Sequence, residues 1–206
     1  MNTQLKPIQN RARVAWLKNL AGEFYLARFE MVAPETIDFS AGQYVIFLTG
    51  GSKPRHTLSI ASSPSERKSI EVLQSVAPMG EGSKWFMNLK SGDDVTFLGP
   101  LGKFIMPKNV DQAKIFVATG CGVAPFRSMI LDYLETGGSA SVTLYWGLRF
   151  EMDVFWQEEW SQLASRYANF RYITTLSKPR DSWQGVRGRV TDHFIKDKEH
   201  FGDAEF

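Results

Sequence analysis

Residues 116–130 read FVATGCGVAPFRSMI, a short apolar run that passes through two glycines into a segment of helical character. Gly120 and Gly122 occupy the first two positions of the dinucleotide fingerprint Gly-x-Gly-x-x-Gly, in which a strand turns into a helix beneath a pyrophosphate. Pro125 stands at the third glycine position. Proline suits the first turn of a helix, because its missing N–H is not needed there and its φ angle is already helical. The stretch therefore predicts a variant nucleotide loop, although similar turns occur in α/β domains that bind no nucleotide.

Beyond residue 107 the sequence alternates between strand and helix patterns. Strands are expected at residues 114–118, 142–146 and 170–175, and helices at residues 125–135 and 189–196. A further helix carries apolar side chains on one face, namely Trp156, Trp160, Leu163 and Tyr167, and this spacing favours a core role over an electron relay. Alternating strands and helices predict a doubly wound parallel sheet.

Before residue 107 the sequence is a series of short strands and turns. Strands are expected at residues 24–31, 42–48, 58–61, 70–76 and 95–98, and one short helix at residues 84–89 with Ser83 as its N-cap. This spacing predicts a six-stranded antiparallel barrel. The predicted fold is an all-β barrel domain, residues 1–108, followed by an α/β domain, residues 109–206.

The composition excludes several classes of protein. The 206 residues are 43% hydrophobic and 22% charged, which suits one or two domains with a real core. The net charge of +2 comes from dispersed Lys and Arg, without the basic stripe of a nucleic-acid binder. Cys121 is the single cysteine, so the chain forms no internal disulfide and no cluster with about four thiolate ligands. The three histidines lack metal-ligand spacing, and no signal peptide or membrane span is evident. We expect a metal-free, cytoplasmic protein.

Several motifs together resemble one family. The segment ATGCGVAPFRSMI follows GPLGKF and precedes LYWGLR, an order that is similar to the ferredoxin–NADP⁺ reductase family, in which a proline at position 125 is usual. The resemblance covers nearly the whole chain. It implies a flavin-binding barrel, an NAD(P)-binding domain, and hydride transfer from NAD(P)H to FAD. The reduced flavin then passes electrons to a separate acceptor, for which ferredoxin or flavodoxin is the leading candidate.

The barrel half carries HTLSIASSP at residues 56–64. In the family an Arg at the first position binds the flavin phosphate, a Tyr at the third stacks on the ring, and the next hydroxyl bonds flavin N5. The resemblance assigns that hydroxyl to Ser59, as a catalytic residue. His56 replaces the Arg and Leu58 the Tyr, while Arg55 is within reach of a phosphate. The alternatives are a strand hydroxyl satisfied by its own backbone for Ser59, and a neutral, partly buried strand residue for His56.

The segment EVLQSVAPMGEGSKWF, residues 71–86, resembles the family's pyrophosphate cradle at a helix start, which favours FAD over FMN. The alternative is an ordinary capped helix. The predicted barrel contacts with the flavin are Arg55, His56, Thr57, Leu58, Ser59, Val72, Leu73, Gln74, Gly80, Gly82 and Ser83.

In the second half, Cys121 stands where the family has Thr or Ser beside the nicotinamide, and the alternative is an inert buried cysteine. The family's NADPH-preferring members carry Ser-Arg after the third parallel strand, where this chain has Ser177 and Lys178. The resemblance therefore predicts a moderate NADPH preference, and the alternative is a solvated basic turn. The predicted NADP(H) contacts are Thr119, Gly120, Cys121, Gly122, Pro125, Arg149, Ser177, Lys178 and Arg180.

Residues 201–206 stand where the family begins a fourth parallel strand, so the resemblance implies an α/β domain that lacks its last strands. We expect a natural protein longer by roughly one strand–helix–strand unit, on the order of 30 residues, or self-association through the open sheet edge. A free-flavin reductase, supported by TLYWGLR and WQGVRG, and a non-catalytic binding module are the alternative functions.

Overall fold

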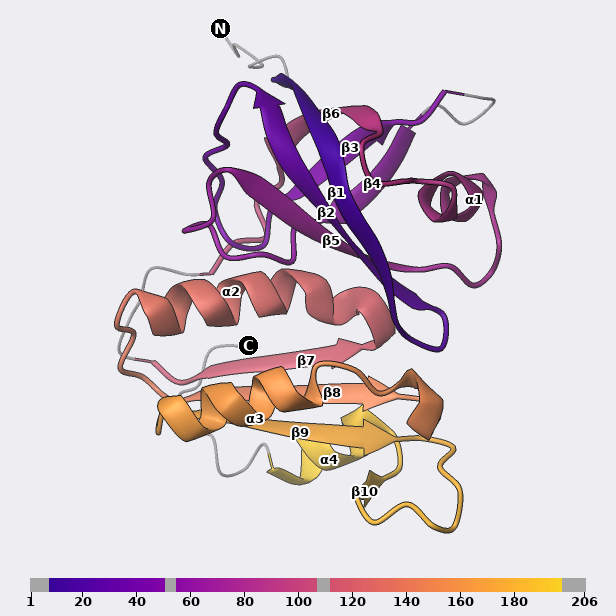
Figure 1. Cartoon of the computed structure of the whole chain (residues 1–206). Helices are drawn as coiled ribbons and strands as arrows, with labels where there is room; N and C mark the ends of the chain where they lie inside the picture. The colour runs from indigo at the N-terminus through magenta and orange to yellow at the C-terminus, as the bar shows by residue number, and fades with distance from the viewer. Residues whose placement is uncertain (1–7, 51–54, 107–111, 198–206) are drawn as a thin grey trace, which may run out of the picture.

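The computed structural model describes residues 8–50, 55–106 and 112–197, which form a barrel packed on an α/β domain (Figure 1). The barrel strands have the order β4-β3-β6-β1-β2-β5, and neighbours are antiparallel. Their bounds are β1 Gln9–Ala21, β2 Phe24–Ala33, β3 Tyr44–Leu48, β4 Arg55–Ser59, β5 Ser69–Ser75 and β6 Asp94–Leu101. A bridge between Ile60 and Val72 joins the outer strands β4 and β5 and closes the sheet. The predicted barrel is confirmed.

Aromatic side chains fill the barrel. Phe29, Phe47 and Phe97 are fully buried, with Phe47 at 4.8 Å from the Phe29 ring and 5.5 Å from the Phe97 ring. Each comes from a different strand, because the inward positions of β2, β3 and β6 alternate with outward ones. Burial of such rings is the main stabilising contribution to a small barrel of this kind.

Two features of the barrel differ from expectation. β1 is the longest strand and was not predicted, because its outward positions carry charges such as Arg11 and Arg13 and its inward position Ala12 is small. Helix α1 spans Glu81–Met87 with Gly80 as its N-cap, so the predicted start at residue 84 with Ser83 as the cap is wrong. The amide of Lys84 already bonds the Gly80 carbonyl at 2.9 Å, which places Ser83 inside the helix.

The α/β domain contains a parallel four-stranded sheet in the order β10-β9-β8-β7. Its elements are β7 Lys114–Thr119, η1 Gly120–Val123, α2 Ala124–Glu135, β8 Val142–Leu148, η2 Glu151–Asp153, α3 Gln157–Arg166, β9 Phe170–Leu176, β10 Val186–Arg187 and α4 Val190–Asp197. Pro125 lies in the first turn of α2, as predicted. The helices cover both faces, since α2 and α3 pack with Phe116 and Leu144, whereas α4 packs with Ile115 and Tyr145. The doubly wound arrangement is confirmed.

The core continues across the domain boundary. Helix α2 runs along that boundary, between the barrel and the parallel sheet (Figure 1). Phe24 and Leu73 of the barrel belong to the same buried cluster as Ile130 of α2 and Trp146 of β8. Trp160 is fully buried in this cluster, and Trp156, Leu163 and Tyr167 pack against it, as their spacing predicts. The two domains therefore share apolar packing rather than only a linker.

Within the described residues, β7 is one of the two edge strands of its sheet, and β10 is the other. The predicted domain boundary at residues 108–109 and the predicted sheet continuation at residues 201–206 lie outside those residues. In the same described part, no helix has the length and apolar character needed to cross a membrane. No group of three His, Cys, Asp or Glu side chains there could hold a metal ion.

Candidate nucleotide and flavin site

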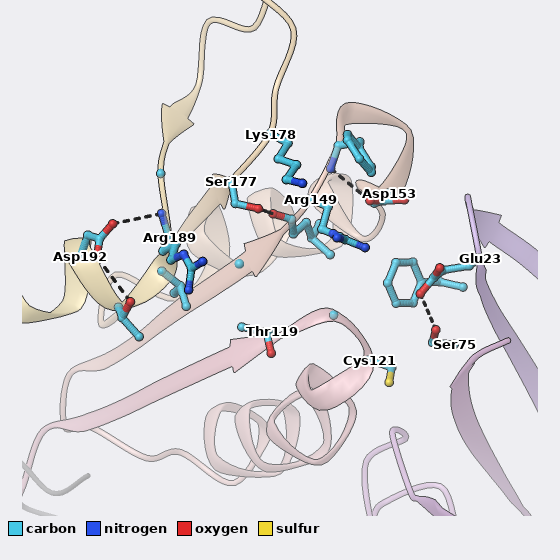
Figure 2. Close-up of a pocket in the computed structure, with 18 residues that line it drawn as sticks. Glu23, Ser75, Thr119, Cys121, Arg149, Asp153, Ser177, Lys178, Arg189 and Asp192 are labelled. Atoms are coloured by element: carbon cyan, nitrogen blue, oxygen red, sulfur yellow. Dashed lines mark hydrogen bonds between the residues drawn. The ribbon is translucent and has the colours of Figure 1, made fainter. Parts of the chain in front are cut away.

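A cavity of about 850 Å³ opens at the carboxyl ends of β7, β8 and β9, where the parallel sheet meets the barrel (Figure 2). Ligands of open α/β sheets bind at this edge. Thr119 and Cys121 lie on one side, and Glu23 and Ser75 from the barrel lie at one end. The cavity is thus formed by both domains.

The glycine loop forms the floor of this cavity. Gly120 has φ +52°, a left-handed conformation that glycine adopts without strain. The indole Nε1–H of buried Trp146 donates to the Gly120 carbonyl at 3.0 Å, and a Cβ on Gly120 would lie 3.6 Å from the Phe24 ring. Neither η1 nor α2 has a side-chain cap at its N-terminus. The loop therefore presents uncapped helix-start amides, which suit a pyrophosphate.

Three cations line the same cavity from separate strand ends. Arg149 follows β8, Lys178 follows β9, and Arg189 follows β10 (Figure 2). Within the described part of the chain, none of the three forms an ion pair with a carboxylate. Cations that converge without carboxylate partners form a site for a multiply charged anion such as a phosphate ester.

Three carboxylates line the cavity as well, but each accepts a hydrogen bond within the protein. Glu23 accepts from Ser75 Oγ at 2.5 Å, and Asp153 accepts from the amide of Phe150 at 3.0 Å. Asp192 accepts from the amide of Arg189 at 3.4 Å. Each of these carboxylates is thus held by a neutral donor, whereas among the described residues none of the three cations has a carboxylate partner.

The turn after β9 fixes which side chains face the cavity. The Ser177 amide donates to the Leu148 carbonyl at 3.0 Å, and the Lys178 amide donates to the Arg149 carbonyl at 2.9 Å. The Arg180 amide donates to Glu151 Oε1 at 2.6 Å. The pKa of the Glu151 carboxyl is lowered, first by a hydrogen bond from its own backbone and then by the Arg180 amide and charge. This bond turns the chain, and Arg180 does not line the cavity.

Sequence reasoning found part of this site. The predicted residues that line the cavity are Thr119, Gly120, Cys121, Arg149, Ser177 and Lys178. Gly122 and Pro125 belong to the loop and the helix start but are not lining residues. Arg189 was missed, and the signal that could have found it is the Gly188-Arg189 pair just before α4, since Gly188 has φ +111°.

The other lining residues that the sequence did not predict come from the β1–β2 turn with the start of β2, the ends of β5 and β8, the η2 segment and the start of α4. They are Glu23, Phe24, Ser75, Gly147, Leu148, Phe150, Asp153, Gly188, Val190, Thr191 and Asp192.

The barrel motif residues engage one another. His56 Nε2 lies 2.5 Å from Gln74 Oε1, and Gln74 Nε2 is 3.5 Å from Ser83 Oγ. A Cβ on Gly82 would lie 2.4 Å from His56 Nδ1, so the imidazole packs directly on that glycine. Leu58 is 9% exposed and packs in the barrel core. Where the family has a tyrosine that stacks on the flavin, this barrel therefore has a buried leucine and no aromatic ring at the surface.

The remaining predicted flavin contacts divide by burial. Val72 and Leu73 are buried in β5. Arg55 and Thr57 are exposed on β4, and Ser59 is half-buried at the end of that strand. A Cβ on Gly80 would meet no atom within 4 Å. The exposed guanidinium and open glycine fit the phosphates of FAD, whereas Leu58 does not fit the role of a stacking residue for its ring.

Arg55 and Ser59 are accessible at the two ends of β4, and their assignment to the phosphates and the ring of FAD stays a prediction. On the α/β side, the glycine loop would hold the pyrophosphate of the nicotinamide coenzyme, because amides at a helix start are suited to anionic oxygens.

Comparison with known proteins agrees with this division. An oxidoreductase FAD-binding domain matches residues 12–106, and an oxidoreductase NAD-binding domain matches residues 116–206. The chain is 35% identical over 191 residues to the phenol hydroxylase P5 protein of Acinetobacter pittii, covering 89% of this chain and 54% of that protein. It is 32% identical over 192 residues to ferredoxin–NADP reductase B of Sorangium cellulosum, covering 92% and 78%.

The fold matches solved reductases. The Amycolatopsis cytochrome P450 reductase GcoB superimposes with a TM-score of 0.84 at 28% identity, covering 94% of this chain and 59% of that one. The chain spans about half the length of some relatives, such as the 54% quoted above. Both halves of the chain and the match to ferredoxin–NADP reductase B show that it belongs to the ferredoxin–NADP⁺ reductase family of oxidoreductases, built from an FAD-binding and an NAD-binding domain.

Proposed function

We propose that this protein transfers hydride from NADPH to FAD and passes the electrons to a separate protein acceptor, ferredoxin or flavodoxin. The observation that supports the proposal is the cavity shared by both domains, which is lined by the glycine loop, by Glu23 and Phe24 of the barrel, and by three cations that have no carboxylate partner among the described residues. The name of the Sorangium relative supports ferredoxin as an acceptor. An oxygenase is a further class of acceptor, because another relative is a phenol hydroxylase component.

The side chains divide the work of binding. Arg149, Lys178 and Arg189 hold the 2′-phosphate of NADPH, because that group is a multiply charged phosphate ester which NADH lacks. The backbone at Gly120 and Cys121, where the loop lines the cavity, holds the pyrophosphate. This arrangement supports a preference for NADPH over NADH.

Cys121, which lines the cavity, borders the nicotinamide, and Ser59, which ends β4 outside the lining residues, steadies the flavin edge. When bound, FAD accepts a hydride from the reduced nicotinamide and releases electrons to the acceptor. The task of the chain is to hold the two rings in contact and to exclude water from between them.

The test is anaerobic stopped-flow mixing of the FAD-loaded protein with NADPH or NADH. We expect both coenzymes to bleach the flavin absorbance. The ratio of the maximal reduction rate to the half-saturating coenzyme concentration should be higher for NADPH than for NADH. Onward transfer is measured by adding ferredoxin or flavodoxin and following their reduction. An FAD-loaded protein that neither coenzyme reduces would contradict the proposal and favour a non-catalytic binding module.

A free-flavin reductase is the second candidate, and Leu58 is the observation that favours it. Without an aromatic ring at that position, the barrel has a weaker hold on the flavin ring, as suits a flavin that binds and leaves as a substrate. Gel filtration separates the two candidates. FAD that stays with the protein supports the bound-flavin reductase, and NADPH oxidation that requires added, exchangeable flavin supports the free-flavin enzyme.

A further inference from the structure

Arg127 of α2 lies at the boundary between the domains and bonds to both. Its side chain is 13% exposed, which is unusual for an arginine. Arg127 lies outside the residues that line the cavity described above. A charge buried at a domain boundary requires a physical role, because burial is costly unless each hydrogen bond is satisfied.

On the barrel side, Arg127 Nη1 donates to the Ala61 carbonyl at 2.8 Å and to Glu71 Oε2 at 3.0 Å. Ala61 follows Ser59 by two residues, and its own amide donates to the Glu71 carbonyl at 2.7 Å. The Ile60 amide donates to the Gln43 carbonyl at 3.0 Å. The carbonyl that Arg127 binds is therefore a rigid continuation of the strand that carries Ser59.

On the α/β side, Arg127 Nε donates to Glu159 Oε1 of α3 at 2.8 Å, and its guanidinium lies 4.7 Å from the Trp156 ring centroid. Trp156 has φ +55°, a left-handed conformation that is uncommon for a bulky residue and brings the ring to the N-terminus of α3. The network also continues into the barrel, since Glu71 pairs with Arg28. One guanidinium thus joins β5, α2 and α3.

Ser128, the next residue of α2, also bonds the barrel segment that follows β4. Ser128 Oγ donates to the Ser62 carbonyl at 2.6 Å, and Ser63 and Ser65 both donate to Glu135 Oε2 at the end of α2, at 2.7 and 3.0 Å. Helix α2 is therefore docked along its length on the segment 61–65, while its N-terminus carries the glycine loop. Helix α2 therefore fixes the position of the strand end that carries Ser59 relative to the glycine loop.

We propose that Arg127 is a positioning residue that sets the separation between the Ser59 strand end and the glycine loop, and thereby the rate of hydride transfer. The inference rests on the proposed function. Hydride transfer needs reacting atoms about 3–3.5 Å apart, and a displacement of about 1 Å costs up to roughly 100-fold in rate. A planar guanidinium with several directed donors can fix such a separation, whereas an ammonium group cannot replace all of its bonds.

The experiment compares Arg127→Met, Arg127→Lys and the matched control Arg13→Met in the full chain. Arg13 pairs with Asp94 on the barrel surface, where both side chains are more than half exposed. We expect Arg127→Met to slow FAD reduction at saturating NADPH by about 10- to 100-fold while the dissociation constant of NADP⁺ changes by less than about threefold. Arg127→Lys should recover part of the rate, and Arg13→Met should match the wild type.

A second measurement reads the domain arrangement without catalysis. In a Cys121→Ser background, nitroxide labels on Lys90→Cys of the barrel and Ser165→Cys of α3, both exposed positions, report the distance between the domains. We expect one narrow distance distribution that broadens or shifts in Arg127→Met. If NADPH does not reduce FAD bound to the wild-type protein, the proposed function has failed. The measured distances then decide by themselves whether Arg127 sets the separation between the domains.

Three results would overturn the proposal. The first is an unchanged distance distribution in Arg127→Met. The second is a normal reduction rate in a variant that has only lost thermal stability. The third is a loss of NADP⁺ affinity by the same factor as the rate, since that would show a damaged loop rather than a displaced one.

Discussion

The two halves of this molecule treat their motif residues in opposite ways. In the α/β half, Arg149 and Lys178 point to one cavity and, within the described residues, leave their charges without carboxylate partners. In the barrel half, His56 bonds Gln74 and packs on Gly82, while Leu58 is buried in the core. A motif residue that is free to bind a ligand is a stronger sign of function than one already satisfied by its neighbours.

This difference bears on affinity. Free cations and uncapped amides gain most of their hydrogen bonds when the coenzyme arrives, whereas a satisfied His56 must give up Gln74 before it can bind a flavin phosphate. We therefore expect the coenzyme site to tolerate little change in charge, and the flavin site to depend on a few groups such as Arg55 and Ser59.

The largest expected effect comes from reversing two cations. Lys178→Glu combined with Arg189→Glu should weaken NADPH binding by at least roughly 100-fold, because each hydrogen bond between charged groups contributes about 1.5–3 kcal/mol. NADH binding, which lacks the 2′-phosphate, should change by less than about threefold. Isothermal titration with both coenzymes measures this. Arg180→Glu is the control, since Arg180 does not line the cavity, and an equal loss for NADH and NADPH would break the comparison.

Leu58→Tyr tests whether this barrel position faces the core. Because Leu58 is 9% exposed, the larger ring should overpack the barrel and lower the free energy of unfolding by about 1–3 kcal/mol. Thermal unfolding should shift down by roughly 2–4 °C per kcal/mol, while Thr57→Tyr on the exposed side of β4 should leave it nearly unchanged. A stable Leu58→Tyr variant that binds FAD more tightly would instead place this position at the flavin ring.

Ser59→Ala should slow FAD reduction by NADPH by about 10-fold, because a hydrogen bond that strengthens as hydride arrives acts on the rate more than on binding. The dissociation constant of FAD should change by less than about threefold. Stopped-flow reduction and fluorescence titration measure the two quantities, with Ser91→Ala on an exposed turn as the control. An unchanged reduction rate would leave Ser59 as an ordinary strand hydroxyl.

The smallest effect concerns pH. Burial raises the pKa of the Glu159 carboxyl, while the Arg127 charge and hydrogen bond lower it. A carboxyl whose pKa is raised in the folded state binds its proton more readily there, so it favours folding at low pH and opposes it as pH rises. Arg127→Met removes the lowering influence, and its loss of stability should be smaller at pH 5 than at pH 8. Denaturant titrations at both values measure this, and an equal loss at both would contradict it.

The sequence predicted the elements whose pattern is local. Pro125 and the two glycines mark a helix start, and buried β8 is apolar throughout. β1 was missed because a strand with one exposed face needs apolar residues only at alternate positions, and those of β1 include Ala12. The start of α1 was misplaced because Gly80 caps the helix through its backbone, which leaves no side-chain signal.

The site was harder to predict than the fold, since it depends on contacts between distant segments. Arg189 and Arg149 are forty positions apart in the numbering and line one cavity only because β8 and β10 end at the same edge of the sheet. Arg127 looks like an ordinary helix residue until Ala61 and Glu71 are seen beside it. Leu58 stands at a motif position, but the sequence does not show that its side chain packs in the barrel core.

The stacking of Arg127 on Trp156 also gives the molecule an optical reporter of its own. Indole emission responds to a nearby charge, so the fluorescence of Trp156 will change when the guanidinium 4.7 Å away leaves its ring. Trp85 of α1 packs against Phe47 of the barrel and does not contact Arg127, so it serves as an internal reference. The difference in emission between the wild type and Trp156→Phe would therefore report opening of the domain boundary in real time, without any attached dye.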